Sequence, residues 1–530
     1  MENPAYEKLK ELRTRKDLTI RPTPHLRDTY IALDGVEKPF SLRYYQIQGM
    51  LHLLTMPRFV LGDDCGIGKT PTTIVALCFL WEKNPSMKAI ILTNKSAVEQ
   101  WASEFMKFTK GIRVLTCKGT PKQREVIRKK YEASTDPTVL IMGYRSAVGD
   151  FTHIQEWKDY SIVFDECSAF KNNSTQVHKV CHYLTSKSSR AWGLSATIIK
   201  NTLIEGWGIY RVIVPGLFGT KEGFLNDFCV IRMQQIPGSR RQIPIIVGYR
   251  PRDIQRFRET IDPFFLGRAK FEVASELPPL TTSVIKVGLS PSQRAKYDEA
   301  LSGLLEVVRG GKTEEKEVTK LTAVAYCQQI VDHPDLIGGE GDSEKLDALM
   351  DLLVDGQFDG EKVIIFTKFR KMVDILMRTL EEKKIGAVRI TGSENEKQRK
   401  DAQDAFQDVK SDTKVICITT AATEAINLQA AKAIIFYDTP WSAGDFLQAL
   451  GRMIRIGSLH DRCFAVHLVA DDTIDDRVMK VLEKKMVLVE SVLGKKIKGE
   501  GDTITVSAEN DISDLFAQLL HDAKVRSGGK

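Results

Sequence analysis

The chain of 530 residues lacks several features that would place it in a membrane or outside the cell. No apolar run reaches the roughly 18 residues that a membrane-spanning helix needs. The N-terminal stretch MENPAYEKLKELRTRKDLTIRP has no apolar core, so we do not expect a secretory signal. None of the nine cysteines stands in a CxxC pair, which argues against a disulfide framework or a zinc ribbon. We therefore expect a cytoplasmic protein.

The chain also lacks a strong excess of either charge. Its 76 basic and 69 acidic side chains give a net charge of +7, and 42% of its residues are hydrophobic. These values are typical of globular proteins. The mild basic excess permits nucleic-acid binding through local patches and does not establish it.

Short apolar runs alternate with amphipathic stretches in two parts of the chain. The first set is RFVLGDD, KAIILTN, TVLIMGY, YSIVFDE and AWGLSAT, and the second is KVIIFTK, AVRITGS, KVICITT, AIIFYDT and CFAVHLV. Strands that alternate with helices predict parallel sheets flanked by helices. We therefore expect an α/β chain with two such halves.

The same pattern predicts the domain boundaries. We expect a basic lead-in, a first half, a second half and a tail, at residues 1–36, 37–262, 263–487 and 488–530. A charged, helical insertion is expected at about 280–350, with an exposed loop RGGKTEEKE at 309–317. Segment 231–250 predicts a hairpin that turns at Gly238-Ser239, and ISDLFAQLLHDA in the tail predicts an amphipathic helix.

The strongest local motif is LGDDCGIGKT at residues 61–70, between an apolar strand and a predicted helix. This is the context of a phosphate-binding loop, in which glycines let backbone amides approach phosphate oxygens. Lys69 would reach the β- and γ-phosphates of a nucleotide, and the Thr70 hydroxyl would bind Mg²⁺. The generic pattern has glycine where this chain has Asp63. The alternative is a glycine turn at a helix start that binds no ligand.

A second motif, SIVFDECS at 161–168, ends a buried strand with two acids. Asp165 would hold Mg²⁺ through water, and Glu166 would act as general base toward an attacking water. The alternative is a pair of solvated acids in a turn.

From about residue 37 to 485 the chain resembles the Swi/Snf-like branch of superfamily 2 helicases, which includes DNA translocases and chromatin remodellers. Its compact build is most similar to that of phage, bacterial or archaeal members. The segments that carry the resemblance are LRYYQIQGM (42–50), DDCGIGKT (63–70), AIILTNKSAVEQWASEF (89–105), VLIMGYRS (139–146), DECSAFKN (165–172), GLSATIIKNTLIEGWGIYRVIVPGLFG (193–219), PFFLGRAKFEVASELPPL (263–280), LSPSQRAKYDEA (289–300), YCQQIVDHPDLI (326–337), KVIIFTKFRKMVDIL (362–376), TTAATEAINLQAAKAIIFYDTPW (419–441) and QALGRMIRIG (448–457).

The resemblance implies two RecA-like lobes that bind ATP and Mg²⁺ between them. Gln46 would recognise adenine, and Asp63 is the residue usual at its position in this branch. Further ATP-binding positions implied are Gly66, Ile67, Gly68 and Gln448. Arg452 and Arg455 would reach the γ-phosphate, with Arg455 as the arginine finger. Ser195 and Thr197 would couple hydrolysis to lobe movement.

The resemblance also implies that the partner is double-stranded DNA, bound through its backbone without sequence preference and in a salt-sensitive way. Single-stranded DNA is a second candidate, and the tail is a candidate site for a protein partner. The predicted DNA contacts, each of which also suits a helix cap or turn, are Ser96, Tyr144, Thr391, Thr420 and Asn427. Arg240 and Arg241 in the hairpin would add a phosphate contact; the alternative is an exposed basic turn.

Three positions depart from the branch's pattern: Ser168 replaces histidine, Ala425 replaces glycine and Ser458 replaces glutamine. None of these changes removes a catalytic group, so we expect an active DNA-dependent ATPase. The predicted function is a motor that moves along duplex DNA. The alternatives are a strand-separating, fork-remodelling or annealing helicase, in which the hairpin is a candidate wedge, and a non-catalytic nucleic-acid-binding scaffold.

Overall fold

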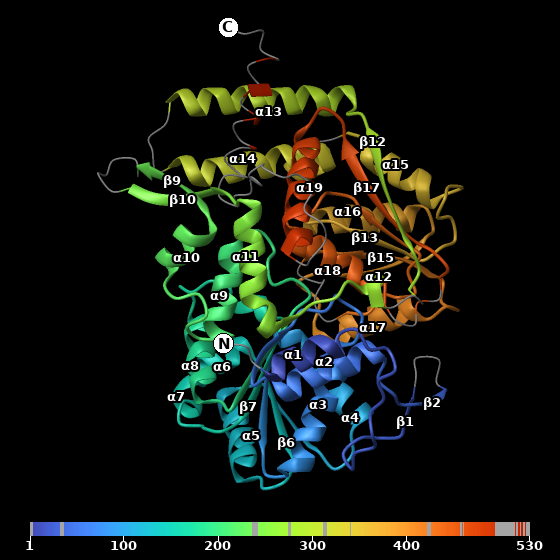
Figure 1. Ribbon diagram of the computed structural model, residues 1–530. Helices are drawn as coiled ribbons and strands as arrows, with labels where there is room; N and C mark the ends of the chain where they lie inside the picture. Colours follow the sequence, from blue (N-terminus) through green and yellow to red (C-terminus); the bar gives the residue numbers. More distant parts are fainter. Residues whose placement is uncertain are drawn as a thin grey trace. The chain divides into compact units, whose positions relative to one another are not determined.

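The computed structural model describes residues 4–31, 36–235, 242–273, 277–310, 315–339, 341–420, 426–455, 458 and 460–492, with scattered residues between 515 and 525 (Figure 1). Contacts divide the chain into two units. Unit 1 comprises Met1–Ile199, Leu203–Phe228 and Arg252–Ser275, and unit 2 comprises Lys200–Thr202, Cys229–Pro251 and Glu276–Lys530. The lead-in and the segment after residue 262 therefore group with unit 1.

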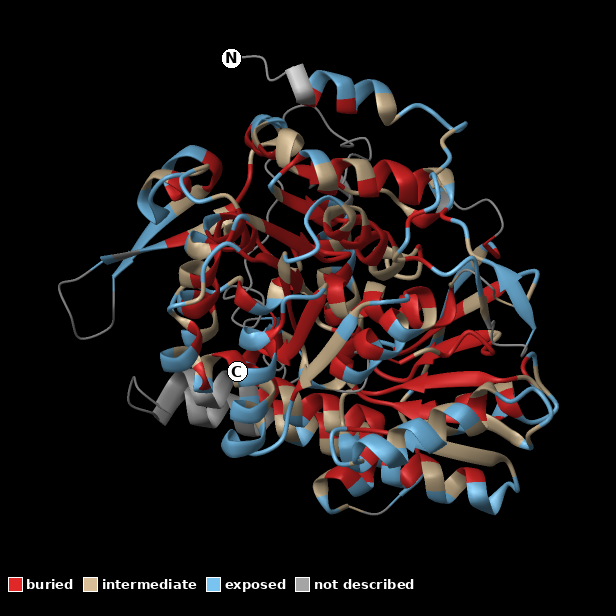
Figure 2. Cartoon of the chain, turned by 90° about the horizontal axis from the view of Figure 1, so that it is seen from below, coloured by how far each residue is buried: buried red, intermediate tan, exposed pale blue. Residues whose placement is uncertain are grey.

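Unit 1 is built on a seven-stranded sheet in which every neighbouring pair of strands is parallel. Across the sheet the strands are β11 (Phe265–Leu266), β3 (Arg58–Leu61), β8 (Arg190–Leu194), β7 (Ser161–Asp165), β4 (Lys88–Thr93), β6 (Thr138–Gly143) and β5 (Arg113–Cys117). All five apolar runs predicted for this half are strands. Their side chains are mostly buried because helices cover the sheet, as Figure 2 shows.

The helices of unit 1 alternate with these strands, as the pattern predicts. They are α1 (Pro4–Leu12), α2 (Tyr44–Thr55), α3 (Lys69–Lys83), α4 (Val98–Phe108), α5 (Pro121–Ala133), α6 (Tyr144–Gly149), α7 (Phe151–Ile154), α8 (Gln176–Lys187), α9 (Leu203–Ile213), α10 (Lys221–Phe228), α11 (Pro251–Ile261) and α12 (Lys270–Val273), with the short 3-10 helices η1 (Lys95–Ala97), η2 (Cys167–Phe170) and η3 (Asp262–Phe264). Strands β1 (Thr29–Ile31) and β2 (Glu37–Pro39) form a separate antiparallel pair.

The lead-in is tied to unit 1 by polar contacts of Arg13. Its guanidinium donates from Nη1 to Asp262 Oδ1 at 2.8 Å and from Nε to His52 Nε2 at 3.2 Å. The carbonyl of Arg13 accepts from Gln48 Nε2 at 3.0 Å. These bonds reach both α2 and the segment after α11, so the lead-in is part of the packed unit.

Unit 2 is built on a six-stranded sheet, also parallel throughout. Across this sheet the strands are β12 (Leu280–Val287), β17 (Cys463–Ala470), β16 (Ala433–Phe436), β13 (Val363–Phe366), β15 (Thr413–Ile418) and β14 (Gly386–Ile390). Its helices are α13 (Pro291–Gly310), α14 (Glu315–Asp332), α15 (Glu344–Leu353), α16 (Arg370–Glu382), α17 (Glu396–Gln407), α18 (Ala443–Met453) and α19 (Ile474–Val492), with the 3-10 helix η4 (Pro334–Ile337). The predicted α/β class with two RecA-like lobes is confirmed.

The structure of this half differs in part from the expected pattern. The insertion expected to be helical from about 280 begins instead with strand β12, which pairs along its whole length with β17. The hairpin is confirmed as antiparallel strands β9 (Val230–Gln235) and β10 (Gln242–Gly248), although its turn lies outside the described residues. Of the loop expected at 309–317, residues 309–310 end α13 and 315–317 begin α14, while 311–314 lie outside the described residues. Most of the predicted tail helix also lies outside them, but Leu515 and Leu519 are buried in a cluster with Tyr297 and Val478.

A buried ion-pair network joins three helices of unit 2. Lys345 of α15 donates to Asp332 of α14 at 2.8 Å and to Asp475 of α19 at 2.6 Å, and all three side chains are inaccessible or nearly so. Tyr437 donates to the carbonyl of Asp332 at 2.8 Å. A buried charge without partners is costly, so each member fixes the place of the others. Within the described part of the chain, no helix is long and apolar enough to span a bilayer.

We predict that unit 1 loses stability in mild acid through His52, a buried residue of α2. Burial lowers the pKa of His52 to about 4. The unfolded chain therefore takes up a proton below about pH 6.5, whereas the folded chain does so only near pH 4. Stability should fall by roughly 3 kcal/mol as the pH drops across this window.

Denaturant unfolding of His52→Gln and wild type at pH 7 and pH 4.5 checks this. His52→Gln should lose markedly less stability between the two pH values. The matched control His153→Gln, at an exposed histidine of α7, should lose as much as wild type. Equal losses in all three proteins would contradict the assignment.

Candidate functional site

The predicted site residues of unit 1 lie at one edge of its sheet. Parallel strands end on the same side, and ligands of α/β proteins bind beyond their carboxyl ends. Strand β3 leads into the loop at 62–68, β7 ends at Asp165, and Ser195 follows β8. The loop, the acidic pair and the predicted coupling residues therefore come from neighbouring strands β3, β8 and β7.

The loop after β3 has the backbone of an anion-binding turn. Gly66 and Gly68 have φ of 91° and 94°, a region that side chains disfavour. Gly68 precedes α3, whose first amides have no side-chain cap and so suit an anionic ligand. The Lys69 ammonium donates to the carbonyls of Asp63 at 2.7 Å and Asp64 at 3.2 Å. These features fit a phosphate group, as the sequence predicts.

Gln46 lies directly against this loop. Its Nε2 donates to the carbonyl of Ile67 at 3.0 Å, and its Oε1 accepts from the Arg43 amide at 2.9 Å. Glycine suits position 68 because its φ is 94°, and a Cβ atom there would stand 2.1 Å from the Gln46 amide nitrogen and displace it. The amide thus links the start of α2 to the loop. Its recognition of adenine stays a prediction.

The Asp63 carboxylate pairs with a guanidinium that lies beyond the loop in sequence. The carboxylate accepts from Nε of Arg268 at 2.8 Å and also pairs with Nη2 of the same residue. Only 3% of the Asp63 side chain and 10% of the Arg268 side chain are exposed. Sequence reasoning missed Arg268, although an acid in place of the generic glycine was a signal that a cation must stand nearby.

The carboxylate of Asp165 is held on one side by two donors. Its Oδ2 accepts from Trp101 Nε1 at 2.7 Å and from Thr93 Oγ1 at 2.8 Å. Burial, followed by the charge of Glu166, raises the pKa of Asp165. A bound cation would favour the charged form of the carboxylate. A carboxylate oxygen is also a ligand that suits Mg²⁺. Trp101 of α4 and Thr93 were not predicted as site residues, because their distance in sequence hides the contact.

Ser195 lies between the acid pair and Thr197. Its hydroxyl is 3.4 Å from Glu166 Oε2 and donates to the carbonyl of Thr197 at 3.0 Å. Glu166 itself has a left-handed backbone, with φ of 49°. Such strained conformations gather at functional sites. The structure therefore brings Ser195 beside the predicted general base, and Thr197 beside Ser195.

In unit 2, the predicted arginines and Gln448 lie on or just after α18. Gln448 and Arg452 are buried, and Arg452 Nη1 donates to the Ile426 carbonyl at 3.5 Å. Arg455, two residues after the last residue of α18, donates from Nε to the Gly451 carbonyl at 2.8 Å. Arg452 thus ties α18 to the segment at 426–428. The action of both arginines on a phosphate stays a prediction.

The predicted DNA contacts differ in exposure. Tyr144 is buried, and its hydroxyl donates to the Asp165 carbonyl at 2.7 Å. Thr391 is buried, and its hydroxyl donates to Glu394 at 2.7 Å. Both hydroxyls therefore bond within the protein, and contact of these two residues with DNA stays a prediction. The half-buried residues are Ser96, Thr420 and Asn427, whereas Arg240 and Arg241 lie outside the described residues.

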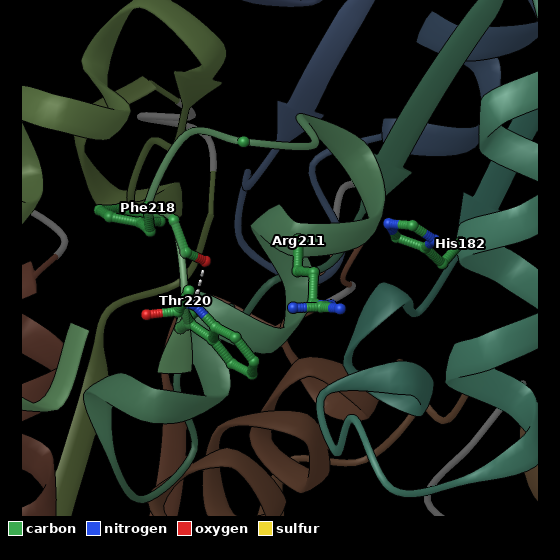
Figure 3. A pocket seen from close by; sticks show the side chains of 7 residues that line it. His182, Arg211, Phe218 and Thr220 are labelled. Carbon is green, nitrogen blue, oxygen red and sulfur yellow. Dashed lines mark hydrogen bonds between the residues drawn. The ribbon is translucent and has the colours of Figure 1, made fainter. Parts of the chain in front are cut away.

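A cavity of about 300 Å³ lies elsewhere on unit 1, by α8 and α9 (Figure 3). It is lined by His182, Trp207, Arg211, Gly216, Phe218, Gly219 and Thr220. The Arg211 guanidinium stands 5.4 Å from the Trp207 ring centroid, and the indole donates to the Gly219 carbonyl at 3.3 Å. None of the predicted site residues lines this cavity.

Comparison with known proteins gives two family matches. The SNF2-related domain matches residues 45–336, and the Helicase conserved C-terminal domain matches residues 344–457. Among curated proteins the chain is similar to an uncharacterized ATP-dependent helicase of Mycoplasma genitalium, with 27% identity over 462 residues, 86% of this chain and 42% of the relative. It is also similar to an ISWI chromatin-remodeling complex ATPase of Saccharomyces cerevisiae, with 27% identity over 511 residues, 92% of this chain and 44% of the relative.

The chain thus spans less than half the length of these curated relatives. Among solved structures it is similar to the Sulfolobus solfataricus SWI2/SNF2 ATPase core in complex with dsDNA. The sequence identity is 22% and the TM-score is 0.41, over 96% of this chain and 99% of that chain.

Proposed function

Because the chain belongs to the SNF2-related family of helicases, we propose that it is an ATP-dependent motor that moves along double-stranded DNA. One observation supports the ATPase part most directly: the Lys69 loop and the Asp165-Glu166 pair share one edge of the unit 1 sheet. Duplex DNA as the track is supported by the motifs shared with DNA translocases and by the likeness to a chromatin-remodeling ATPase.

The residues of unit 1 suit separate tasks in hydrolysis. Bound ATP with Mg²⁺ supplies the free energy and the phosphorus that water attacks. Lys69 would hold the phosphates, while Thr70 and Asp165 would hold the metal ion. Glu166 would orient the attacking water and take its proton. Protonation of Glu166 would change its contact with the Ser195 hydroxyl, and Ser195 is hydrogen-bonded to Thr197. From unit 2, Arg452 and Arg455 would stabilise the charge that develops on the phosphate, with Arg455 as the finger.

A strand-separating helicase is the second candidate, and the β9–β10 hairpin favours it. The last four residues of β9, 232–235, are exposed, as a wedge between strands would be. The two candidates differ in product: a translocase leaves the duplex paired, and a helicase releases a single strand.

We predict that duplex DNA stimulates ATP hydrolysis at least about tenfold, because partner binding assembles the productive site. Steady-state hydrolysis should be measured without nucleic acid and with duplex DNA, single-stranded DNA or RNA. Lys69→Ala and Glu166→Gln should abolish it, and higher salt should weaken the stimulation.

The other outcomes of this assay separate the alternatives. Absence of hydrolysis under all conditions would overturn the motor and favour a scaffold. Stimulation by single strands alone, with release of a labelled strand from a forked duplex, would favour the helicase.

A second prediction concerns Trp101, a positioning residue for Asp165. Trp101→Phe keeps the ring but removes a donor to the Asp165 carboxylate. A hydrogen bond to a charged group contributes about 1.5–3 kcal/mol, so kcat should fall at least about tenfold. The Mg²⁺ concentration for half-maximal activity should rise at the same time.

The matched control is Trp81→Phe, which removes a 2.7 Å bond from a buried indole to the Met87 carbonyl, near the end of α3 away from the loop. It should leave the Mg²⁺ dependence unchanged. A Trp101→Phe protein with the Mg²⁺ dependence of wild type would show that the indole only fills space.

A further inference from the structure

Asp63 is the position where the phosphate loop departs from the generic glycine, and the catalytic scheme above gives its carboxylate no task. In the structure that carboxylate receives two donors from one guanidinium, that of Arg268. A bidentate pair of this kind fixes the orientation of the carboxylate relative to the guanidinium as well as the distance between them. Because both side chains are almost fully buried, water screens the attraction little.

Arg268 belongs to the segment at 265–270, here called the connector. Beyond it the chain passes from unit 1 into unit 2, and the described residues from Leu277 onward group with unit 2. Strand β11 at the start of the connector pairs with β3, the strand that leads into the loop. The connector therefore runs beside the loop on the way out of unit 1.

Hydrogen bonds continue this pairing through the first three loop residues. The Gly62 amide donates to the Leu266 carbonyl at 2.7 Å, and the Asp64 amide donates to the Arg268 carbonyl at 3.1 Å. The Asp64 carboxylate accepts from the Lys270 amide at 3.0 Å. Thus the connector contacts residues 62, 63 and 64 in turn.

The same loop residues set the position of Lys69. Its ammonium donates to the carbonyls of Asp63 and Asp64, the two residues that the connector holds. Arg268 also donates from Nη1 to the Tyr45 carbonyl and to Gln48 Oε1, and both acceptors flank Gln46 on α2. One guanidinium therefore joins the connector, the phosphate loop and the helix that carries Gln46.

We propose that Arg268 is a positioning residue that latches the phosphate loop, through Asp63, to the segment that leads into unit 2. Displacement of the connector then moves the two carbonyls that hold Lys69. Nucleotide binding at the loop in turn restrains the connector. The effect on ATP rests on the proposed function, but the latch itself is a property of the free protein.

Cys65 provides a probe of the latch that needs no nucleotide. It follows Asp64 in the loop and is half-exposed, whereas the other eight cysteines are buried. A thiol reagent therefore reports how often the loop opens. We expect labelling of Cys65, located by peptide mapping, to quicken about tenfold in Arg268→Gln and in Asp63→Asn. Arg268→Lys keeps the charge without the bidentate contact, so its Cys65 labelling rate should lie between that of these variants and that of wild type.

The matched control is Arg128→Gln. Arg128 of α5 forms an equally buried pair with Asp150, whose exposed side-chain fraction of 3% equals that of Asp63. This variant should lose folding stability yet label Cys65 at the wild-type rate. The double variant Asp63→Asn with Arg268→Gln should label no faster than either single variant, because both changes break one contact.

The second arm measures ATP. In Arg268→Gln the KM for ATP should rise at least about tenfold, whereas Arg128→Gln should keep the wild-type KM. Equal Cys65 labelling in Arg268→Gln and Arg128→Gln would overturn the latch. If the wild-type chain hydrolyses no ATP but Cys65 labelling responds as expected, the latch stands and the proposed function fails.

Discussion

The parallel register of the unit 1 sheet is the constraint on which the site depends. Each pairing from β11 to β5 is parallel, so the last residue of every strand lies at the same carboxyl-terminal edge of the sheet. Lys69 and Ser195 are more than a hundred residues apart in the sequence, and Asp165 lies between them. All three nevertheless follow strands that are neighbours in the sheet. A reversed strand would remove its residue from that edge. The chemistry therefore rests on backbone hydrogen bonds between apolar strands.

The groups at this edge are held by buried partners rather than by solvent. Trp101 and Thr93 orient Asp165, Ser195 contacts Glu166, and Arg268 holds Asp63. Such supporting contacts place reacting groups to within the tolerance that catalysis needs. In the connector this support has a second consequence, because the segment that holds the loop is also the one through which the chain leaves unit 1.

The central strands of both sheets were predictable from sequence, whereas of the four edge strands only β14 was predicted, from the run AVRITGS. Strands such as β6 and β16 are buried on both faces and appear as continuous apolar runs. The missed strands β5, β11 and β12 are all edge strands, and β5 and β12 carry polar, partly exposed side chains. Because an edge strand has one neighbour, its sequence needs less apolar surface. Motifs located Lys69, Asp165 and Glu166, but Arg268 lies 205 residues from Asp63 and Trp101 lies 64 residues from Asp165. Local patterns do not show pairs at such distances.

The central claim is that ATP hydrolysis moves the protein along duplex DNA, and displacement of a third strand tests it most directly. A labelled oligonucleotide is bound as a triplex near one end of a linear duplex, and its release is followed with ATP. The account predicts release that requires ATP, that Glu166→Gln abolishes and that leaves the duplex paired. Vigorous DNA-stimulated hydrolysis without release of the third strand would contradict it.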